Sequence, residues 1–347
     1  MFLLIIYKNI MTCFIPNYKV NAQSVELSSE MKIKNFEYIL PTGIIASSFQ
    51  DLWKKGYTGL NIKVAIIDTG IDRSHPDLSN KVLISTNYTR ETVIVNSHGT
   101  HVAGTIAANG LLKGGAPDAK LIDIKALSQI GGSIFNVIRG INFAVANGAS
   151  VINMSIGTSF LRLFEKQLLE RVITNAYNKG CICIAASGND GISICTEDPF
   201  QYPASINIVE SVAACKVDPS FNVELSVFSN ENNRVDLAAC GENVLSTVIG
   251  RRYSIFSGTS MATPHVSAML ALLFQQVKQT LPTLRGKNLS DEVLKRLRNN
   301  IFKVDACNNS ISFGKGFLRY DPSKKVDVNT LKNRPYYIGG VLIGYEY

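Results

Sequence analysis

The chain has 347 residues, of which 46% are hydrophobic and 18% are charged, so it can bury a large core and is neither disordered nor fibrous. Its 35 Lys and Arg outnumber its 27 Asp and Glu, which gives a net charge of +8. Because the basic residues are spread along the chain and do not interleave with aromatic residues, no nucleic acid is expected as a partner.

Residues 1–45 precede the regular pattern of elements and are predicted to form an N-terminal extension. Residues 2–7 are apolar, but Lys8 and Asn9 end this run. The run is too short to span a membrane, and no positive charge precedes it as in a signal peptide. No later segment reaches about 18 uninterrupted apolar residues, so no membrane is expected as a partner. We predict a cytoplasmic protein, with secretion as the alternative.

From residue 60 onward, short runs rich in β-branched residues alternate with helix-like stretches. The predicted strands are 63–67, 121–125, 150–154, 181–186 and 208–213, and the predicted helices lie near 98–108, 133–147 and 162–179. This alternation predicts βαβ units, and hence an α/β fold whose mostly parallel sheet has helices on both faces. Ligands of such sheets bind at the carboxyl ends of the strands, where the polar motifs described below are predicted to lie.

The seven cysteines show no C-x-x-C spacing, which argues against a zinc site or a disulfide framework. Cys181 and Cys183 alternate with Ile182 and Ile184, as in a strand buried on both faces. We interpret these thiols as small core side chains. So many unpaired thiols favour a reducing compartment.

Two polar motifs occur in the first half of the chain. Asp68 ends an apolar strand and precedes a turn glycine, Gly70; its carboxylate could be structural, a metal ligand or catalytic. His98 and His101 are spaced i and i+3, as metal ligands can be, but no Glu accompanies them in the H-E-x-x-H manner.

A third motif contains Ser260, which is predicted to open an apolar helix with Pro264 in its first turn. A serine in this position is ordinarily a helix N-cap. Together with Asp68 and His98, however, it completes the set that activates a hydroxyl nucleophile: a base takes the hydroxyl proton, and a buried carboxylate orients the imidazole.

The segments VAIIDTGID (64–72), HGTHVAGTIA (98–107) and GTSMATPHV (258–266) resemble the three signature motifs of the subtilisin-like serine proteases, the subtilases, in the same order. The resemblance extends over residues 40–320. It implies a three-layer subtilisin-like fold over residues 46–325, with 326–347 as a C-terminal tail. It also implies a serine endopeptidase that acts through an acyl-enzyme, with Asp68, His98 and Ser260 as the catalytic triad.

The same resemblance suggests the other site residues. Asn189 and the N–H of Ser260 would form the oxyanion hole. Polypeptide substrates would bind as an added strand beside residues 130–137, which include Gly131 and Gly132. The two walls of the primary specificity pocket would be Ser155, Ile156 and Gly157 on one side and Ala186, Ser187 and Gly188 on the other. Its floor would be Gln201. A further apolar pocket would be formed by Ile134, Val137 and Ile156, which could also be plain core packing.

Gln201 would stand where relatives commonly carry Gly. An apolar substrate side chain reaching it would desolvate its amide without offering a partner. We therefore expect smaller or polar residues to be preferred before the cleaved bond.

Residues 14–20, FIPNYKV, resemble the short inhibitory extension of the intracellular subtilisins of spore-forming bacteria, with one extra residue, Asn17, between Pro16 and Tyr18. The resemblance implies a zymogen held inactive by its own N-terminal segment. A homodimer is left open.

Family members usually bind a structural Ca²⁺, here with Asp77 as a ligand, together with a loop that corresponds to residues 108–117. In this chain the loop is short and carries Lys113 where oxygen ligands are needed, so the resemblance leaves this site open. No catalytic metal is implied.

Two other functions remain open from the sequence. One is a peptidase of the same fold dedicated to trimming a single leader peptide. The other is an inactive binding protein with a subtilisin fold.

Overall fold

The computed structural model describes residues 13–16, 19–25, 38–94, 96–191, 199–304, 312–320, 335–338 and 341–346. Its helices are α3 (Thr42–Ala46), α4 (Phe49–Trp53), the 3₁₀ turn η1 (Pro76–Leu78), α5 (His98–Ala107), α6 (Ile134–Ala146), α7 (Leu163–Asn178), α8 (Thr259–Thr280) and α9 (Gly286–Arg298). Its strands are β1 (Cys13–Pro16), β2 (Lys19–Val25), β3 (Ile39–Pro41), β4 (Lys63–Asp68), β5 (Val82–Asn87), β6 (Lys120–Lys125), β7 (Gly132–Ser133), β8 (Val151–Met154), β9 (Ile156–Gly157), β10 (Ile182–Ala186), β11 (Glu210–Val217), β12 (Val223–Leu225), β13 (Leu237–Cys240), β14 (Val244–Val248), β15 (Arg252–Ser257), β16 (Ile301–Phe302), β17 (Phe317–Leu318), β18 (Pro335–Ile338) and β19 (Val341–Glu346).

The main sheet runs in the order β16-β17-β13-β11-β10-β8-β4-β6-β5, with β12 paired to β11. All neighbours from β17 to β5 are parallel, and only β16 and β12 pair antiparallel. The sequence therefore predicted the fold class correctly, and each of the five predicted strands and three predicted helices is present. The strand order reverses beside β4, which is where a ligand site is expected in a sheet of this kind.

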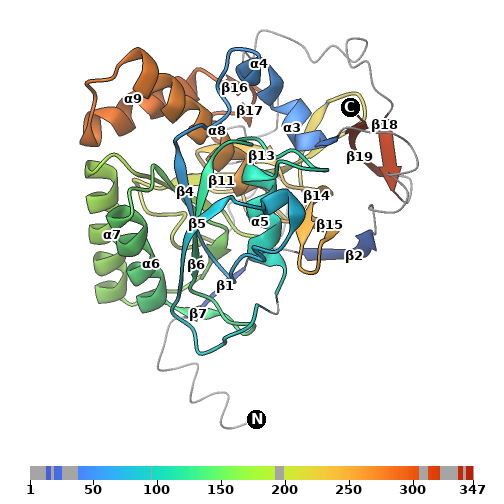
Figure 1. Ribbon diagram of the computed structural model, residues 1–347. Helices are drawn as coiled ribbons and strands as arrows, with labels where there is room; N and C mark the ends of the chain where they lie inside the picture. Colours follow the sequence, from blue (N-terminus) through green and yellow to red (C-terminus); the bar gives the residue numbers. More distant parts are fainter. Residues whose placement is uncertain are drawn as a thin grey trace, which may run out of the picture.

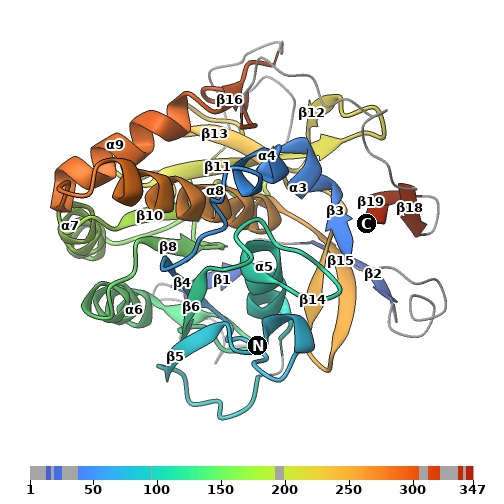
Figure 2. The same cartoon turned by 45° about the horizontal axis from the view of Figure 1, so that its top comes forward.

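Helices cover both faces of the sheet, so the molecule has three layers (Figures 1 and 2). In β4, Val64 and Ile66 pack into one core cluster with α5, α8 and α9. The alternate residues Ala65 and Ile67 pack into a second cluster with α6 and α7, which stand side by side at one flank. The near-continuous apolar run of β4 is needed because successive side chains point to opposite faces, and both faces are buried.

Strand β10 follows the same rule. Ile182 and Ile184 belong to the cluster beneath α8, whereas Cys181 and Cys183 belong to the cluster beneath α6 and α7. The two thiols are almost fully buried and unpaired, and burial raises the pKa of Cys183 to about 12. They are inert core side chains, as the alternation predicted.

Three smaller sheets join the terminal regions to the main body. β1 lies between β7 and β9, β2 pairs with β15, and β19 joins β18 to β3. The expected boundary of the N-terminal extension at residue 45 falls inside α3. Within the described ranges, the structure contains no helix that combines the length and apolar character required to cross a bilayer.

Candidate active site

Asp68 and His98 meet at the carboxyl edge of the sheet, because β4 ends at Asp68 and α5 begins at His98. The Nδ1 atom of His98 lies 2.8 Å from Oδ1 and 3.0 Å from Oδ2 of Asp68, and both residues are fully buried. This approach requires Gly99, since a Cβ there would lie 2.5 Å from the carbonyl oxygen of Gly70 and 3.1 Å from Oδ1 of Asp68. The geometry fixes one orientation of the imidazole.

The turn after Asp68 supports this pair. The Thr69 N–H donates to Oδ1 of Asp68 at 2.7 Å, and the Thr69 hydroxyl accepts from the N–H of Gly99 at 3.0 Å. The side chain of Asn96 in turn accepts from the N–H of His98 at 2.8 Å. The carboxylate and the start of α5 are therefore held by the same short turn.

Ser260 is the second residue of α8 and is fully buried. Its hydroxyl donates to the carbonyl oxygen of Ser155 at 2.7 Å, and the Ser155 hydroxyl donates to the carbonyl oxygen of Ser260 at 2.8 Å. This second bond replaces one that the helix cannot make, because Pro264 has no N–H for the carbonyl four residues before it. Since α8 begins at Thr259, Pro264 lies in the second turn, and the expectation that it lies in the first turn was wrong.

Asn189 is oriented by Thr259. Its Oδ1 accepts from the N–H of Thr259 at 2.9 Å and from the Thr259 hydroxyl at 3.0 Å. Because both partners are donors, the amide oxygen must face Thr259, and the amide N–H₂ is left on the other side. The N–H of Ser260 belongs to the first turn of α8, where no acceptor exists inside the helix. The amide N–H₂ of Asn189 and the N–H of Ser260 therefore both lie at the start of α8.

The two other histidines of these motifs are structural. His101 directs Nε2 to the carbonyl oxygens of Val244 and Ser254, at 3.0 and 3.2 Å, and burial lowers its pKa to about 3. His265 also has a backbone partner: its Nδ1 lies 2.9 Å from the carbonyl oxygen of Met261, and burial lowers its pKa to about 4. His98 and His101 therefore point to different partners and do not form a metal pair.

The two predicted pocket walls are neighbours, because β8 and β10 pair in parallel; residues 155–157 follow β8, and residues 186–188 begin at the last residue of β10. Gln201 is 7% exposed, and a Cβ on Gly188 would lie 2.6 Å from its Cγ. Its Nε2 donates to Oδ2 of Asp190, an exposed carboxylate, at 2.6 Å, which uses one of the two N–H groups of the amide. The expected preference for smaller or polar residues before the cleaved bond stays a prediction.

Strand β1 occupies the space between the two predicted substrate-binding segments. Cys13 and Phe14 lie opposite Ser133 and Gly132, and Ile15 and Pro16 lie opposite Gly157 and Ile156, antiparallel on both sides. Phe14 is fully buried in the cluster that contains Ile134, Val137 and Ile156. Phe14 is therefore part of the same apolar cluster as the three residues predicted to form the further pocket. Asn17 and Tyr18, the remainder of the motif, lie outside the described residues.

The surroundings of Asp77 do not fit a calcium ion. Its Oδ1 accepts from the N–H of Leu111 at 3.0 Å, and its Oδ2 accepts from the N–H of Leu112 at 2.8 Å and from the Tyr253 hydroxyl at 3.1 Å. Ca²⁺ needs six to eight oxygen ligands, whereas this loop turns donors toward the carboxylate. Lys113 extends over the ring of Tyr38 at 4.4 Å. In the part of the chain that the structure describes, no group of three or more His, Cys, Asp or Glu is arranged to hold a metal.

Sequence reasoning missed several residues at the sheet edge: Thr259, Asp190, and the pair Glu91 and Lys125. Only Lys125 left a signal, because a charged residue ends the otherwise buried strand β6. Thr259 lies inside the third motif, beside Ser260, but its contact with Asn189 joins distant segments. The contacts of Asp190 and Glu91 also join distant segments, and such contacts leave no local pattern.

Comparison with known proteins matches residues 59–314 to the subtilase family, Peptidase S8. The chain is 39% identical over 291 residues to the major intracellular serine protease of Bacillus subtilis (strain 168), covering 80% of this chain and 87% of that protein. It is 39% identical over 248 residues to an intracellular serine protease of Paenibacillus polymyxa, covering 68% of this chain and 73% of that protein. It is also 37% identical over 291 residues to subtilisin E of Bacillus subtilis (strain 168), covering 80% of this chain and 70% of that protein. The resemblance of the three motifs is thereby confirmed, and the chain belongs to the subtilase family as a subtilisin-like serine protease.

Proposed function

We propose that the protein is a serine endopeptidase that cleaves extended polypeptides through Asp68, His98 and Ser260, and that its own N-terminal segment holds it inactive. The observation that carries the proposal is the buried contact of His98 Nδ1 with both carboxylate oxygens of Asp68. A buried carboxylate in this position holds the imidazole in the tautomer whose Nε2 can act as a base.

In the reaction, Nε2 of His98 takes the proton of the Ser260 hydroxyl as its oxygen attacks the scissile carbonyl. The imidazolium then donates this proton to the leaving amine, and water releases the acyl group by the reverse sequence. The Ser260 hydroxyl donates to the Ser155 carbonyl, so it must rotate toward His98 before the attack. The amide N–H₂ of Asn189 and the N–H of Ser260 would stabilise the oxyanion.

The autoinhibition is supported by the pairing of β1. β1 pairs with β7 on one side and with β9 on the other, and we call the space between these two strands the substrate groove. An extended substrate would bind there through the same main-chain pairing. β1 ends opposite Ile156, and β2 begins opposite Ser257, three residues before Ser260 in the sequence. Pro16 fixes φ and has no N–H, which makes this segment a poor substrate.

The substrate class follows from the same groove. Main-chain pairing with β7 and β9 requires an unfolded segment and imposes little sequence preference, whereas the pocket filled by Phe14 favours an apolar side chain. Gln201 beside Gly188 narrows the primary pocket and favours smaller or polar residues before the cleaved bond. The buried free cysteines and the intracellular relatives favour a cytoplasmic enzyme.

The test is incubation of the purified protein, both as the full chain and trimmed to begin at Ser29, with unfolded casein, followed by mass mapping of the fragments and of the enzyme's own N-terminus. Because the N-terminal segment is proposed to hold the full chain inactive, the trimmed chain should cut faster. We expect many cuts in casein and a Ser260 that reacts with a fluorophosphonate probe. A single cut, confined to one leader-like sequence, would favour a processing peptidase. Lack of both cleavage and labelling in the trimmed chain would instead indicate a binding protein without peptidase activity.

A further inference from the structure

Lys125 is a buried cation at the carboxyl end of β6, with only 5% of its surface exposed. Its Nζ donates to the carbonyl oxygen of Thr69 at 3.0 Å, to that of Leu127 at 3.1 Å and to Oε2 of Glu91 at 3.0 Å. The three donors of the ammonium are thus all used, by three separate segments. One of these segments is the turn that directly follows Asp68.

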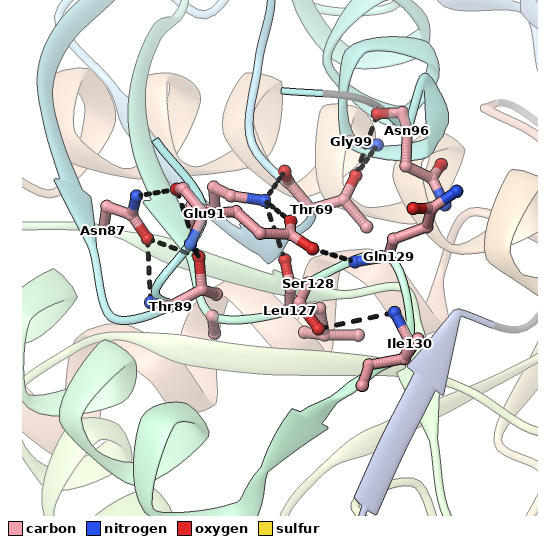
Figure 3. Close-up of polar contacts among 12 residues, drawn as sticks. Thr69, Asn87, Thr89, Glu91, Asn96, Gly99, Leu127, Ser128, Gln129 and Ile130 are labelled. Carbon is pink, nitrogen blue, oxygen red and sulfur yellow. Dashed lines mark hydrogen bonds and ion pairs between the residues drawn. The ribbon is translucent and has the colours of Figure 1, made fainter. Parts of the chain in front are cut away.

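Glu91 is the link to the substrate groove. While Oε2 accepts from Lys125, Oε1 accepts from the N–H of Gln129 at 2.9 Å. Figure 3 shows the Glu91 side chain reaching across to Gln129, with Ser128 and Ile130 beside it. The N–H of Gln129 and the Lys125 ammonium hold the pKa of Glu91 below its ordinary value, so the carboxylate stays charged.

The segment held in this way leads directly to the groove edge. Residues 128–131 form a tight turn, in which the Ser128 N–H and hydroxyl donate to the carbonyl oxygen of Gly131 at 2.9 and 2.7 Å. β7 begins at the next residue, Gly132, and pairs with β1. The Glu91–Lys125 pair therefore holds the turn at two points. Lys125 binds the carbonyl oxygen of Leu127, just before the turn, and Glu91 binds the N–H of Gln129, within it.

We propose that the Glu91–Lys125 ion pair positions the substrate groove: it fixes turn 128–131, and with it the β7 edge, relative to the strand that carries Asp68. This inference rests on the proposed function, since the position of β7 affects catalysis only if substrates pair with it. The hydrogen bonds of the pair described above reach neither the triad side chains nor β1, so both residues are positioning residues.

The proposal makes a prediction that a purely structural role does not. A tetrapeptide anilide with Phe as its first residue reaches β7, as Phe14 does, whereas an acetylated single-residue anilide with the same leaving group does not. Loosening β7 should therefore weaken the pairing of the long substrate and not that of the short one. Because β1 also pairs with β7, its inhibition should weaken as well, for both substrates alike. In the full chain both substrates must displace the N-terminal segment, so this inhibition cancels in the ratio of their kcat/KM values.

The experiment compares full-length wild type with Glu91→Gln, which keeps the size of the side chain and removes its charge. We expect the ratio of kcat/KM, long to short, to fall about tenfold, because only the long substrate pairs with β7. Glu91→Ala, which removes both hydrogen bonds, should lower the ratio further. Glu292→Gln is the matched control, because Glu292 forms a 3.0 Å ion pair with Arg296 on α9, away from the groove.

An unchanged ratio in both Glu91 variants would overturn the proposal, as would an equal loss for the two substrates or an equal effect of Glu292→Gln. Thermal unfolding of each variant checks that the chain is folded. If a chain trimmed to begin at Ser29 cleaves neither anilide and a fluorophosphonate does not label its Ser260, the proposed function itself fails, and this inference fails with it.

Discussion

Asn189 depends on one neighbour for its orientation. Its amide oxygen is held by the N–H and the hydroxyl of Thr259, the residue just before Ser260. In the proposed mechanism, the same short segment therefore supplies the nucleophile, one oxyanion donor and the orientation of the other donor. Little side-chain conformational entropy therefore remains to be lost when the oxyanion forms.

Replacing Asn189 with Ala should lower kcat with little change in KM, because the oxyanion exists only in the transition state. In subtilisin itself, loss of one such donor costs about 100- to 1,000-fold in kcat, and we expect the same order here. Steady-state kinetics on a peptide anilide measures the effect. Thr259→Ala, which removes one orienting bond and keeps the donor, should cost less, and an unchanged kcat in Asn189→Ala would remove Asn189 from the mechanism.

At the scale of elements, β1 offers an internal comparison. Phe14 and Ile15 are adjacent in one strand, but Phe14 is fully buried whereas Ile15 is 53% exposed. Alternate residues of a strand point to opposite sides, so only one of the two contributes its side chain to the groove.

Phe14→Ala should raise the basal peptidase activity of the full chain about tenfold or more, because it empties a core-like pocket that holds β1 in place. Ile15→Ala should change the activity little. Both are measured on the intact chain, before self-cleavage, by the initial rate of anilide hydrolysis. Equal activation by the two variants would show that the pocket does not hold the extension.

The loop after α5 is closed by hydrogen bonds to Asp77 from Leu111, Leu112 and Tyr253. If these donors stand in for a cation, EDTA should leave Tm unchanged. Asp77→Asn should lower the free energy of unfolding by about 1–3 kcal/mol, since an amide offers one acceptor where two are needed. A fall of Tm in EDTA that Ca²⁺ restores would instead indicate a bound ion.

At the scale of the whole molecule, the core contains titratable groups whose charged forms are disfavoured. Burial raises the pKa of Asp123 on β6 to about 7, and the nearby charge of Asp68 adds to the rise. A carboxyl whose pKa rises on folding contributes stability at low pH and loses it as the pH rises through 7. Neutral His101 and His265 act in the opposite sense, since their lowered pKa values cost stability as the pH falls below about 6.5.

Asp123→Asn should therefore stabilise the protein by about 2–4 kcal/mol at pH 8 and by little near pH 4, where the wild-type carboxyl is already protonated. Urea unfolding in a Ser260→Ala background avoids self-cleavage. Asp51→Asn on the surface of α4 is the control and should change little. A gain that is the same at both pH values would mean that charge burial is not its cause.

The sequence by itself determined the α/β class, the strands of the sheet core and the positions of Asp68, His98 and Ser260. Apolar runs and glycine-bearing turns are local patterns, so they can be recognised without knowing the partners of each segment. The domain limits and the roles of the pocket residues remain predictions.

Only the tertiary structure decided which distant groups meet. Three contacts join segments far apart in the chain: the hydrogen bond from the Ser155 hydroxyl to the Ser260 carbonyl, the N–H groups that donate to Asp77, and the Glu91–Lys125 ion pair. The same holds for β1, whose seven-residue motif gave no indication of the register that buries Phe14. Hydrogen bonds and ion pairs between segments depend on how the elements pack, and packing leaves no periodic trace in the sequence.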